Sequence, residues 1–504
     1  MSSLIKYLAA LLLLLSCTDP SRARTSYTAA VVEYHPVDQR GNDSNFVLNA
    51  NLAEYEKFIE EAKGQNADIV VFPEYGLTGL GASNTRKLAL QYAQTVPPAP
   101  KHEEAAEVPC LSPNSSMAIR RLSCSSRKNK IYVVVNLPEV VPCNLNDLDC
   151  PEDGFYIYNT NVVFDRDGGV ISKYHKYNLY LEKSMNKPQE PMYSTFQTDF
   201  SVTFGVFICF DILFKEPAFN LVKVMKVKNL IFSTAWISQL PFLTAVQTQE
   251  SWAFGLDVNL LASGLNHPEA GNGGSGIYAG GKGRLASIMP STSGSQLIIT
   301  QVPLMQRVDA VPDSVNTVFQ YKTTNSVSHM HLRHDDLSNY TFSQALVNGS
   351  NDIKLCNRNL CCNFHADVQF SDDGHEAPIY RFATADTQIK YGHTYKANIH
   401  VCALLYCEDV DETKCVYYPD DPQSLDNVNF KSIEISGNFL SSQMIFPSTL
   451  ATSLEPLPVS SLSFMKNDDE TTLQLTKDSQ GLLTFALYAR NFNSSTFEVS
   501  TLQP

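Results

Sequence analysis

Three reactive side chains, Glu74, Lys176 and Cys209, each lie at the end of a short predicted strand. In α/β sheets, chemistry is usually built where strands end. A carboxylate held partly away from water there gains proton affinity and can act as a base. A lysine among aromatic residues can hold its charge near a reacting carbonyl. A cysteine becomes a nucleophile where a base or a cation favours its thiolate.

Each of these residues also has a structural interpretation when it is taken alone. Glu74 could cap a helix or lie in a loop, Lys176 could be a surface cation, and Cys209 could be a buried structural thiol. The catalytic interpretation therefore depends on the three segments together.

The elements that must position these residues are predicted from hydrophobic periodicity. Strand-like apolar runs alternate with helix-like periodicity, which is typical of an α/β layered domain. The region 98–128 is predicted to be irregular because prolines lie in or beside it. The predicted strands are 27–34, 69–72, 131–135, 162–164, 170–172, 204–208 and 230–232, and the predicted helices are 45–64 and 241–256.

The composition changes beyond about residue 310. Ser, Thr and Asn increase there, cysteines gather, and short alternating stretches resemble strands near 370, 397–405 and 432–435. We expect a boundary near 310–330, with a catalytic domain over 24–315 and a smaller β-rich, disulfide-stapled domain over 316–504. A chain of 504 residues is long enough for two domains.

The N-terminal segment 1–23 is predicted to be a secretory signal peptide. Lys6 precedes an apolar run over Leu8–Leu15, and small or polar residues follow. No other segment is apolar enough to cross a membrane, and the polar C-terminus lacks the hydrophobic tail of a glycolipid anchor signal. We therefore expect a secreted, extracellular protein without an anchor. Five glycosylation sequons agree with this, at Asn42, Asn114, Asn339, Asn348 and Asn493.

The cysteine count supports the same compartment. Of the twelve cysteines, Cys17 falls within the predicted signal and eleven remain. An odd number in an oxidising compartment leaves one free thiol. Cys209 stands alone between an N-terminal cluster of four and a C-terminal cluster of six. We expect Cys209 to be free and the bridges to stay within each cluster.

The bulk composition excludes some classes of protein. Hydrophobic residues make up 43% and charged residues 18% of the chain, so it is predicted to be globular. The formal net charge of −14 and the lack of a basic run argue against a nucleic-acid partner. The sequence predicts no oligomeric state.

Several weaker motifs are discounted. Gly271–Gly276 matches a dinucleotide-binding pattern but lacks the expected strand and helix, so we interpret it as a pocket loop. His329, His331 and His334 are interpreted as solvated, and the C-terminal cysteines as disulfides rather than zinc ligands. No metal site is predicted. A papain-like pairing of Cys209 with His267 lacks the local signature of that family.

Together, the three segments resemble the nitrilase superfamily and, more closely, its vanin and biotinidase branch. The resemblance depends on Phe72-Pro73-Glu74, on Tyr174-His175-Lys176 with Asn178-Leu179, and on the segment 207–214. Thr234-Ala235-Trp236 and 274–278 support it further. It extends over about 26–310 and more weakly through the C-terminal domain. One departure is Ser233, where the family usually has proline near the expected pocket wall.

This resemblance implies an α-β-β-α sandwich and three catalytic roles. Glu74 would be the proton acceptor, Lys176 the proton donor or oxyanion stabiliser, and Cys209 the nucleophile. Glu182 is considered a supporting carboxylate that orients Lys176. No cofactor is implied.

The function expected from the resemblance is hydrolysis of a linear amide of a small molecule through a cysteine thioester. The favoured substrate is pantetheine, which would yield pantothenate and cysteamine. A close alternative is biotinidase-like hydrolysis of biotinyl-lysine amides. A third alternative, from another class, is a secreted binding protein that has lost catalysis.

Overall fold

The computed structural model describes residues 24–492, except 39–42, 102–103, 145, 147–148, 306–329, 372–376, 392–394 and 468–469. The predicted signal peptide, most of the predicted domain boundary, and His329, Asn42 and Asn493 lie outside the described residues. The boundary therefore stays a prediction.

The first sheet has six strands in the order β13-β1-β2-β3-β4-β5. The central strands β1, β2 and β3 pair in parallel, and the outer pairs are antiparallel. Valine and isoleucine dominate β2 and the start of β3, and β1 carries the apolar run Ala29–Val32, as expected for parallel strands buried on both faces. The bounds are β1 Ser26–Glu33, β2 Ile69–Val71, β3 Tyr132–Pro142, β4 Phe155–Phe164, β5 Val170–His175 and β13 Gln296–Pro303.

The second sheet has six strands in the order β12-β11-β10-β8-β7-β6. Here β7, β8 and β10 pair in parallel. The bounds are β6 Ser194–Gln197, β7 Thr203–Ile208, β8 Asn229–Thr234, β10 Asn259–Gly264, β11 Ser275–Ala279 and β12 Arg284–Ile288.

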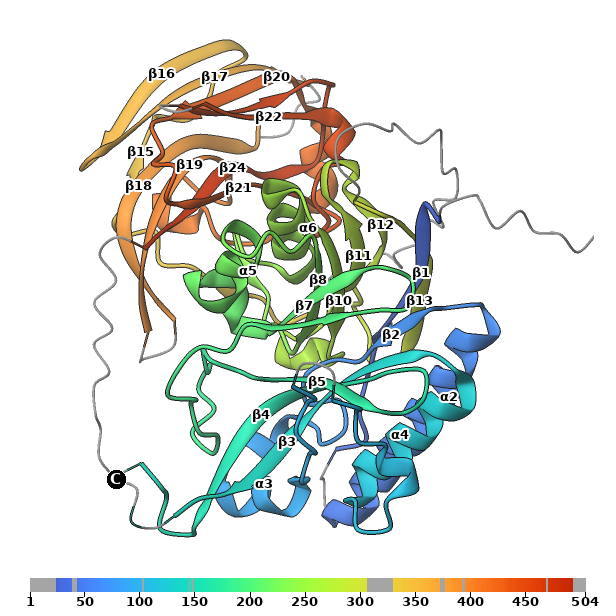
Figure 1. The fold of residues 1–504 in the computed structure, drawn as a ribbon. Coiled ribbons are helices and arrows are strands. Elements are labelled where there is room, and N and C mark those ends of the chain that lie inside the picture. Colours follow the sequence, from blue (N-terminus) through green and yellow to red (C-terminus); the bar gives the residue numbers. More distant parts are fainter. Residues whose placement is uncertain are drawn as a thin grey trace, which may run out of the picture.

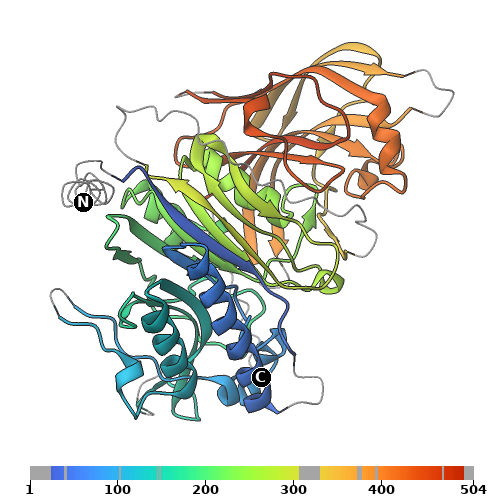
Figure 2. The same cartoon turned by 90° about the vertical axis from the view of Figure 1, so that its right-hand side faces the viewer.

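These two sheets form the inner layers of an α-β-β-α sandwich (Figures 1 and 2). Alternate residues of β1 point to opposite faces: Ala29 and Val31 enter the core between the sheets, and Ala30 and Val32 pack under α2 and α4. On the outer face of the second sheet lies α6. The helices are α2 Ser44–Gly64, α3 Arg86–Tyr92, α4 Met117–Asn129, α5 Asn220–Lys223 and α6 Ala245–Leu256.

Most of the predicted catalytic-domain elements are confirmed, with two corrections. The region 98–128, predicted to be irregular, contains most of α4. The prolines precede this helix, and its buried face carries Ala118, Ile119 and Leu122 among polar residues. The second correction concerns the lengths of β3 and β4: β3 continues to Pro142, past the predicted end at Val135, and β4 begins at Phe155, before the predicted start at Val162.

The C-terminal domain consists of two five-stranded sheets, as the predicted β-rich domain requires. Their orders are β15-β18-β19-β24-β21 and β16-β17-β20-β23-β22, all antiparallel. One hydrophobic core lies between them, with Phe364, Phe382 and Phe485 among its members. The bounds are β15 Thr341–Phe342, β16 Gly349–Asn357, β17 Leu360–Phe370, β18 Ile379–Tyr391, β19 Tyr395–Cys407, β20 Val428–Gly437, β21 Met444–Ala451, β22 Leu462–Lys466, β23 Thr471–Leu475 and β24 Leu482–Asn491.

The disulfide prediction is confirmed. Every bridge stays within its own cluster, and Cys209 is the free cysteine among the described residues. The pairs are Cys110–Cys124, Cys143–Cys150, Cys356–Cys361, Cys362–Cys402 and Cys407–Cys415.

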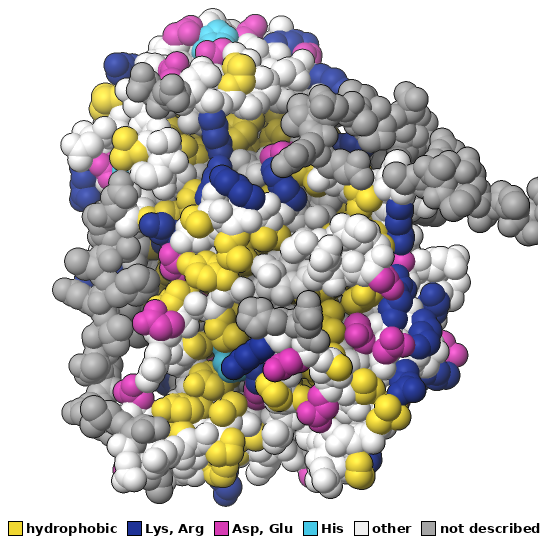
Figure 3. All heavy atoms as spheres, viewed as in Figure 1, with side chains coloured by type: hydrophobic (Ala, Val, Ile, Leu, Met, Phe, Trp, Pro, Cys, Tyr) yellow, Lys and Arg dark blue, Asp and Glu magenta, His cyan; other side chains and the backbone are white. Residues whose placement is uncertain are grey.

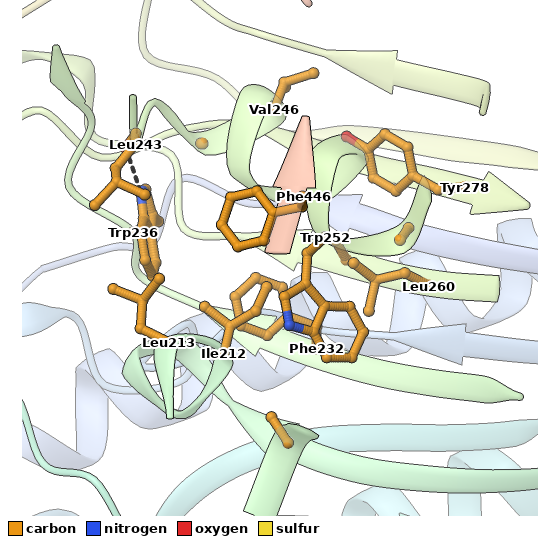
Figure 4. Close-up of a cluster of buried hydrophobic side chains, with 14 of the residues drawn as sticks. Ile212, Leu213, Phe232, Trp236, Leu243, Val246, Trp252, Leu260, Tyr278 and Phe446 are labelled. Carbon is orange, nitrogen blue, oxygen red and sulfur yellow. Dashed lines mark hydrogen bonds between the residues drawn. The ribbon is translucent and has the colours of Figure 1, made fainter. Parts of the chain in front are cut away.

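The two domains pack together over α6 (Figure 1). Phe446 of β21 enters the cluster that contains Trp252 of α6 and Phe232 of β8 (Figure 4). Polar contacts accompany this packing: the Gln247 amide donates to the Ser448 hydroxyl at 2.9 Å, and the Arg490 guanidinium donates to the Leu213 carbonyl at 2.9 Å. The hydrophobic core is therefore continuous from one domain to the other.

A short parallel pair also links the chain after residue 329 to the catalytic domain. It joins β9, Gln239–Leu240, to β14, Arg333–His334.

No helix among the described residues is long and apolar enough to cross a membrane. On the face shown in Figure 3, Lys and Arg side chains lie scattered among Asp and Glu side chains.

Candidate active site

Cys209 lies in the sharp turn that follows β7. The turn continues as a short 3-10 helix, Cys209–Leu213, and Cys209 itself has φ 47°, a left-handed conformation that is uncommon for a residue with a Cβ. Its side chain is buried. Such strain is found where the surrounding structure fixes a functional side chain. The turn thus holds the thiol in one place at the end of the sheet.

Glu74 follows β2 and is also buried. Its Oε1 accepts hydrogen bonds from Lys176 Nζ at 2.7 Å and Asn159 Nδ2 at 2.8 Å, and its Oε2 accepts one from the Ala235 backbone N–H at 2.9 Å. The Cys209 thiol lies within the electrostatic reach of the same carboxylate, whose negative charge raises the pKa of the thiol. Glu74 is therefore in position to exchange a proton with Cys209.

Lys176 follows β5 and lies between two carboxylates. Its Nζ is 2.7 Å from Glu74 Oε1 and 2.6 Å from Glu182 Oε2. Burial alone would lower the pKa of Lys176, but the negative charges of Glu182 and Glu74 raise it well above the usual value. The ammonium therefore keeps its charge in this buried place.

Glu182 lies beside Lys176, as the sequence analysis considered. Its carboxylate also accepts hydrogen bonds from Asn159 Nδ2 at 2.6 Å, from the Tyr180 backbone N–H at 3.0 Å and from the Tyr75 hydroxyl. Burial opposes the ionised form, but the charge and hydrogen bond of Lys176 hold the pKa of Glu182 below its usual value. Glu182 is therefore a permanent negative charge that fixes the position of Lys176.

The electrostatics favour a neutral thiol before substrate arrives. Burial, followed by the negative charge of Glu74, raises the pKa of Cys209. Burial also raises the pKa of Glu74, although Lys176 acts in the opposite direction. A base whose pKa is raised in this way can take the thiol proton while sulfur attacks and can return it later. The arrangement can thus support cysteine nucleophilic catalysis.

Two functional positions were missed by the sequence analysis. Asp211 is fully buried and accepts hydrogen bonds from the Tyr174 hydroxyl at 2.7 Å and from the Asn178 backbone N–H at 2.9 Å, which ties the Cys209 turn to the Lys176 segment. Burial raises its pKa to about 6. Asn159 of β4 contacts both carboxylates. Asp211 lies within the segment 207–214 on which the family resemblance depends, but no spacing in the sequence marks Asn159.

A small pocket, with a cavity volume of about 40 Å³, opens at Cys209. Its wall is mostly apolar, as in small-molecule sites. Three of its residues, Leu213, Trp236 and Leu243, lie close together, and the Trp236 indole N–H donates to the Leu243 carbonyl at 2.8 Å (Figure 4). The other residues of its wall include Tyr180, Phe210, Ala235, Arg333 and Tyr391.

Ser233, the departure from the family pattern, does not line this pocket. Its hydroxyl donates to the Phe72 carbonyl at 2.8 Å and accepts from Asn161 Nδ2 at 3.1 Å. The side chain thus bridges the two sheets behind the site. Ser233 lies near the pocket wall in the chain, two residues before Ala235, but its side chain points between the sheets.

The discounted motifs have structural roles in the described chain. Glu33 accepts hydrogen bonds from Ser275 and from the Gly274 backbone, so it anchors the Gly271–Gly276 loop. His267 is 3.6 Å from Glu269 and exchanges backbone hydrogen bonds with Asn272. No group of three or more potential metal ligands occurs among the described residues.

Comparison with models of protein families first identifies the class of protein. Residues 28–257 match the model of the carbon-nitrogen hydrolase family, and residues 329–495 match the vanin C-terminal domain. An amidase from Nesterenkonia sp. is 18% identical with a TM-score of 0.41, over 56% of this chain and 92% of the amidase. Nit3 of Saccharomyces cerevisiae, a member of branch 10 of the nitrilase superfamily, is 21% identical with a TM-score of 0.42, over 56% and 92% of the two chains.

Relatives that match almost the whole chain then identify the branch of the nitrilase superfamily. Vanin-like protein 3 of Drosophila melanogaster is 35% identical over 494 residues, which cover 94% of this chain and 91% of that protein. Pantetheinase of Bos taurus is 31% identical over 509 residues, 97% of this chain and 94% of the relative. The chain belongs to the vanin branch of the nitrilase superfamily.

This membership decides the class of reaction. The protein is an amidohydrolase that acts on carbon–nitrogen bonds other than peptide bonds. The expected α-β-β-α fold with a disulfide-stapled β-rich domain is likewise confirmed.

Proposed function

We propose that this protein hydrolyses pantetheine to pantothenate and cysteamine through a thioester on Cys209. The observation that carries the proposal is one free, buried thiol that interacts electrostatically with both Glu74 and Lys176, which are themselves hydrogen-bonded to each other at 2.7 Å. The preference for pantetheine is supported by relatives named pantetheinase, such as the Bos taurus protein.

In the first half-reaction, Glu74 takes the proton of Cys209 as sulfur attacks the amide carbon. The carbonyl oxygen gains negative charge, which Lys176 and a backbone N–H near Phe210 stabilise. When the carbon–nitrogen bond breaks, Glu74 gives its proton to the departing amine. The acid half is then bound to sulfur as a thioester, and Glu74 is ionised again.

In the second half-reaction, water replaces the amine. Glu74 takes a proton from this water as its oxygen attacks the thioester carbon. The carbon–sulfur bond breaks, the proton returns to Cys209, and the free acid leaves. Lys176 stays protonated throughout because Glu182 and Glu74 stabilise its charge.

The test is release of pantothenate from pantetheine by the purified protein, beside a Cys209→Ala variant. We expect release by the native protein and none above background by the variant. The thermal unfolding of the variant serves as the control for folding. Hydrolysis of biotinyl-lysine without hydrolysis of pantetheine would replace the proposed substrate and keep the reaction. A folded native protein that cleaves neither amide would contradict the proposal.

We also propose that the protein is secreted and glycosylated. The disulfides require an oxidising compartment to form and persist. Asn114, Asn339 and Asn348 are exposed, so each sequon is accessible to a glycan. Enzymatic removal of N-glycans from protein collected from the medium of expressing animal cells should lower its apparent mass. An unchanged mass, or retention in the cytosol, would contradict this proposal.

A further inference from the structure

Arg333 reaches the active-site pocket from outside the two sheets of the catalytic domain. It lies in β14, which pairs in parallel with β9. The Arg333 backbone N–H donates to the Ser238 carbonyl at 2.9 Å, and the Asp335 N–H donates to the Leu240 carbonyl at 2.9 Å. These bonds fix the backbone that carries the guanidinium.

The side chain of Arg333 is fixed as well. Its Nη1 donates to the Tyr180 hydroxyl at 2.6 Å, and both residues line the pocket with Cys209. The Tyr180 backbone N–H is in turn bonded to Glu182, and its ring contacts Phe210 with 5.0 Å between centroids. The guanidinium therefore belongs to the same rigid assembly as the catalytic groups.

This guanidinium lacks a carboxylate partner in the described chain. No Asp or Glu oxygen there lies within 4.0 Å of its nitrogens, although the side chain is only partly exposed. Much of the surrounding wall is apolar, with Leu213, Trp236 and Ile237 in it. An arginine has five N–H donors, so a substrate that displaces water here must supply an acceptor or leave donors unsatisfied.

We propose that Arg333 is a specificity-determining residue that donates a hydrogen bond to an oxygen of the acid half of the substrate. This inference rests on the proposed thioester chemistry at Cys209. The acid half stays attached to sulfur while the amine leaves and water enters, so it is the half that the pocket must hold in both steps. The pantoyl hydroxyls of pantetheine and the ureido oxygen of a biotinyl group share this acceptor chemistry.

The test measures binding, so that it does not depend on turnover. Dissociation constants are measured for Cys209→Ala and for Cys209→Ala with Arg333→Met. The first ligand pair is pantetheine and its analogue with both pantoyl hydroxyls replaced by hydrogen. The second pair is biotinyl-lysine and octanoyl-lysine. Methionine keeps an unbranched apolar side chain of similar reach but has no donor.

We expect the ligand with the oxygen acceptor to bind about ten- to a hundredfold more tightly in at least one pair, which is the range for a hydrogen bond to a charged donor. This preference should fall below about threefold with Arg333→Met. Tyr180→Phe, which removes the partner of the guanidinium, should reduce it in part. A merely structural role would weaken both ligands of a pair equally.

Two results would overturn the inference: no preference in either pair, or a preference that Arg333→Met leaves unchanged. The proposed substrate fails separately, in the turnover assay with Cys209 intact. A protein that prefers the biotinyl ligand and does not cleave pantetheine would lose the proposed substrate and keep the role of Arg333.

Discussion

At the scale of single residues, the site is a balance of three buried charges. Glu74 and Glu182 flank Lys176, so the cluster carries one more negative than positive charge when all three are ionised. This excess helps to keep Cys209 protonated and Lys176 charged. Catalysis then requires the proton of Cys209 to move only as far as Glu74.

The role of Glu182 can be tested by Glu182→Gln. Removing its charge loosens Lys176, and we expect kcat/KM to fall about 100-fold. The pH profile gives a more specific readout. The charge of Glu182 raises the pKa of Glu74, so its removal lowers that pKa. Because Glu74 must be ionised to act as the base, the acidic limb of kcat/KM should move to lower pH.

The matched control for this variant is Glu190→Gln, because Glu190 is exposed and lies outside the cluster. It should leave both the rate and the pH profile unchanged. An acidic limb that stays in place in Glu182→Gln, or moves to higher pH, would argue against the charge balance described for the site.

At the scale of elements, the end of β10 is held by a close backbone approach. Gly264, the last residue of β10, lies where an added Cβ would collide with the Gly274 carbonyl oxygen. The Gly264 N–H also donates a hydrogen bond to the Ser275 hydroxyl at 2.7 Å, which fixes the strand end against the loop. The Gly271–Gly276 loop is thus packed directly on the end of a strand.

We expect Gly264→Ala to destabilise the protein by about 1–3 kcal/mol, because the backbone of the loop must move away. Gly64→Ala is the matched control. Gly64 is the last residue of α2 and has no atom within 4 Å of an added Cβ, so alanine there should leave stability unchanged or raise it by up to about 1 kcal/mol. Free energies of unfolding from urea titrations compare the two, and equal effects would contradict the packing argument.

At the scale of the whole molecule, the C-terminal domain is part of the structure that supports the site. Phe446 is fully buried against the cluster around α6, and its ring lies 5.4 Å from that of Tyr488. Arg490 of β24 is bonded to the Leu213 carbonyl in the turn that begins at Cys209. The domains should therefore unfold together.

Phe446→Ala removes a ring from this shared core. We expect a loss of about 3–5 kcal/mol in the free energy of unfolding, with one transition for both domains. Phe46→Ala is the control: Phe46 is 54% exposed on α2, and its loss should cost less than about 1 kcal/mol. A separate early transition, with the activity retained after it, would show that the catalytic domain does not need its neighbour.

The sequence by itself determined the candidate catalytic residues, the order of most catalytic-domain elements and the isolation of Cys209. These features are local or countable: apolar runs of fixed period, a reactive residue after a strand, and an odd number of cysteines. Region 98–128 was misjudged because its prolines dominated the prediction, although they only precede α4. Periodicity was a better guide there than composition.

Only the tertiary structure decided which distant side chains meet. Asn159 contacts Glu74 and Glu182 because β4 lies beside β3 and β5 in one sheet. Arg333 reaches the pocket because β14 pairs with β9, more than ninety positions earlier in the sequence. Such contacts depend on strand order and domain packing, and neither is encoded in the spacing of residues along the chain.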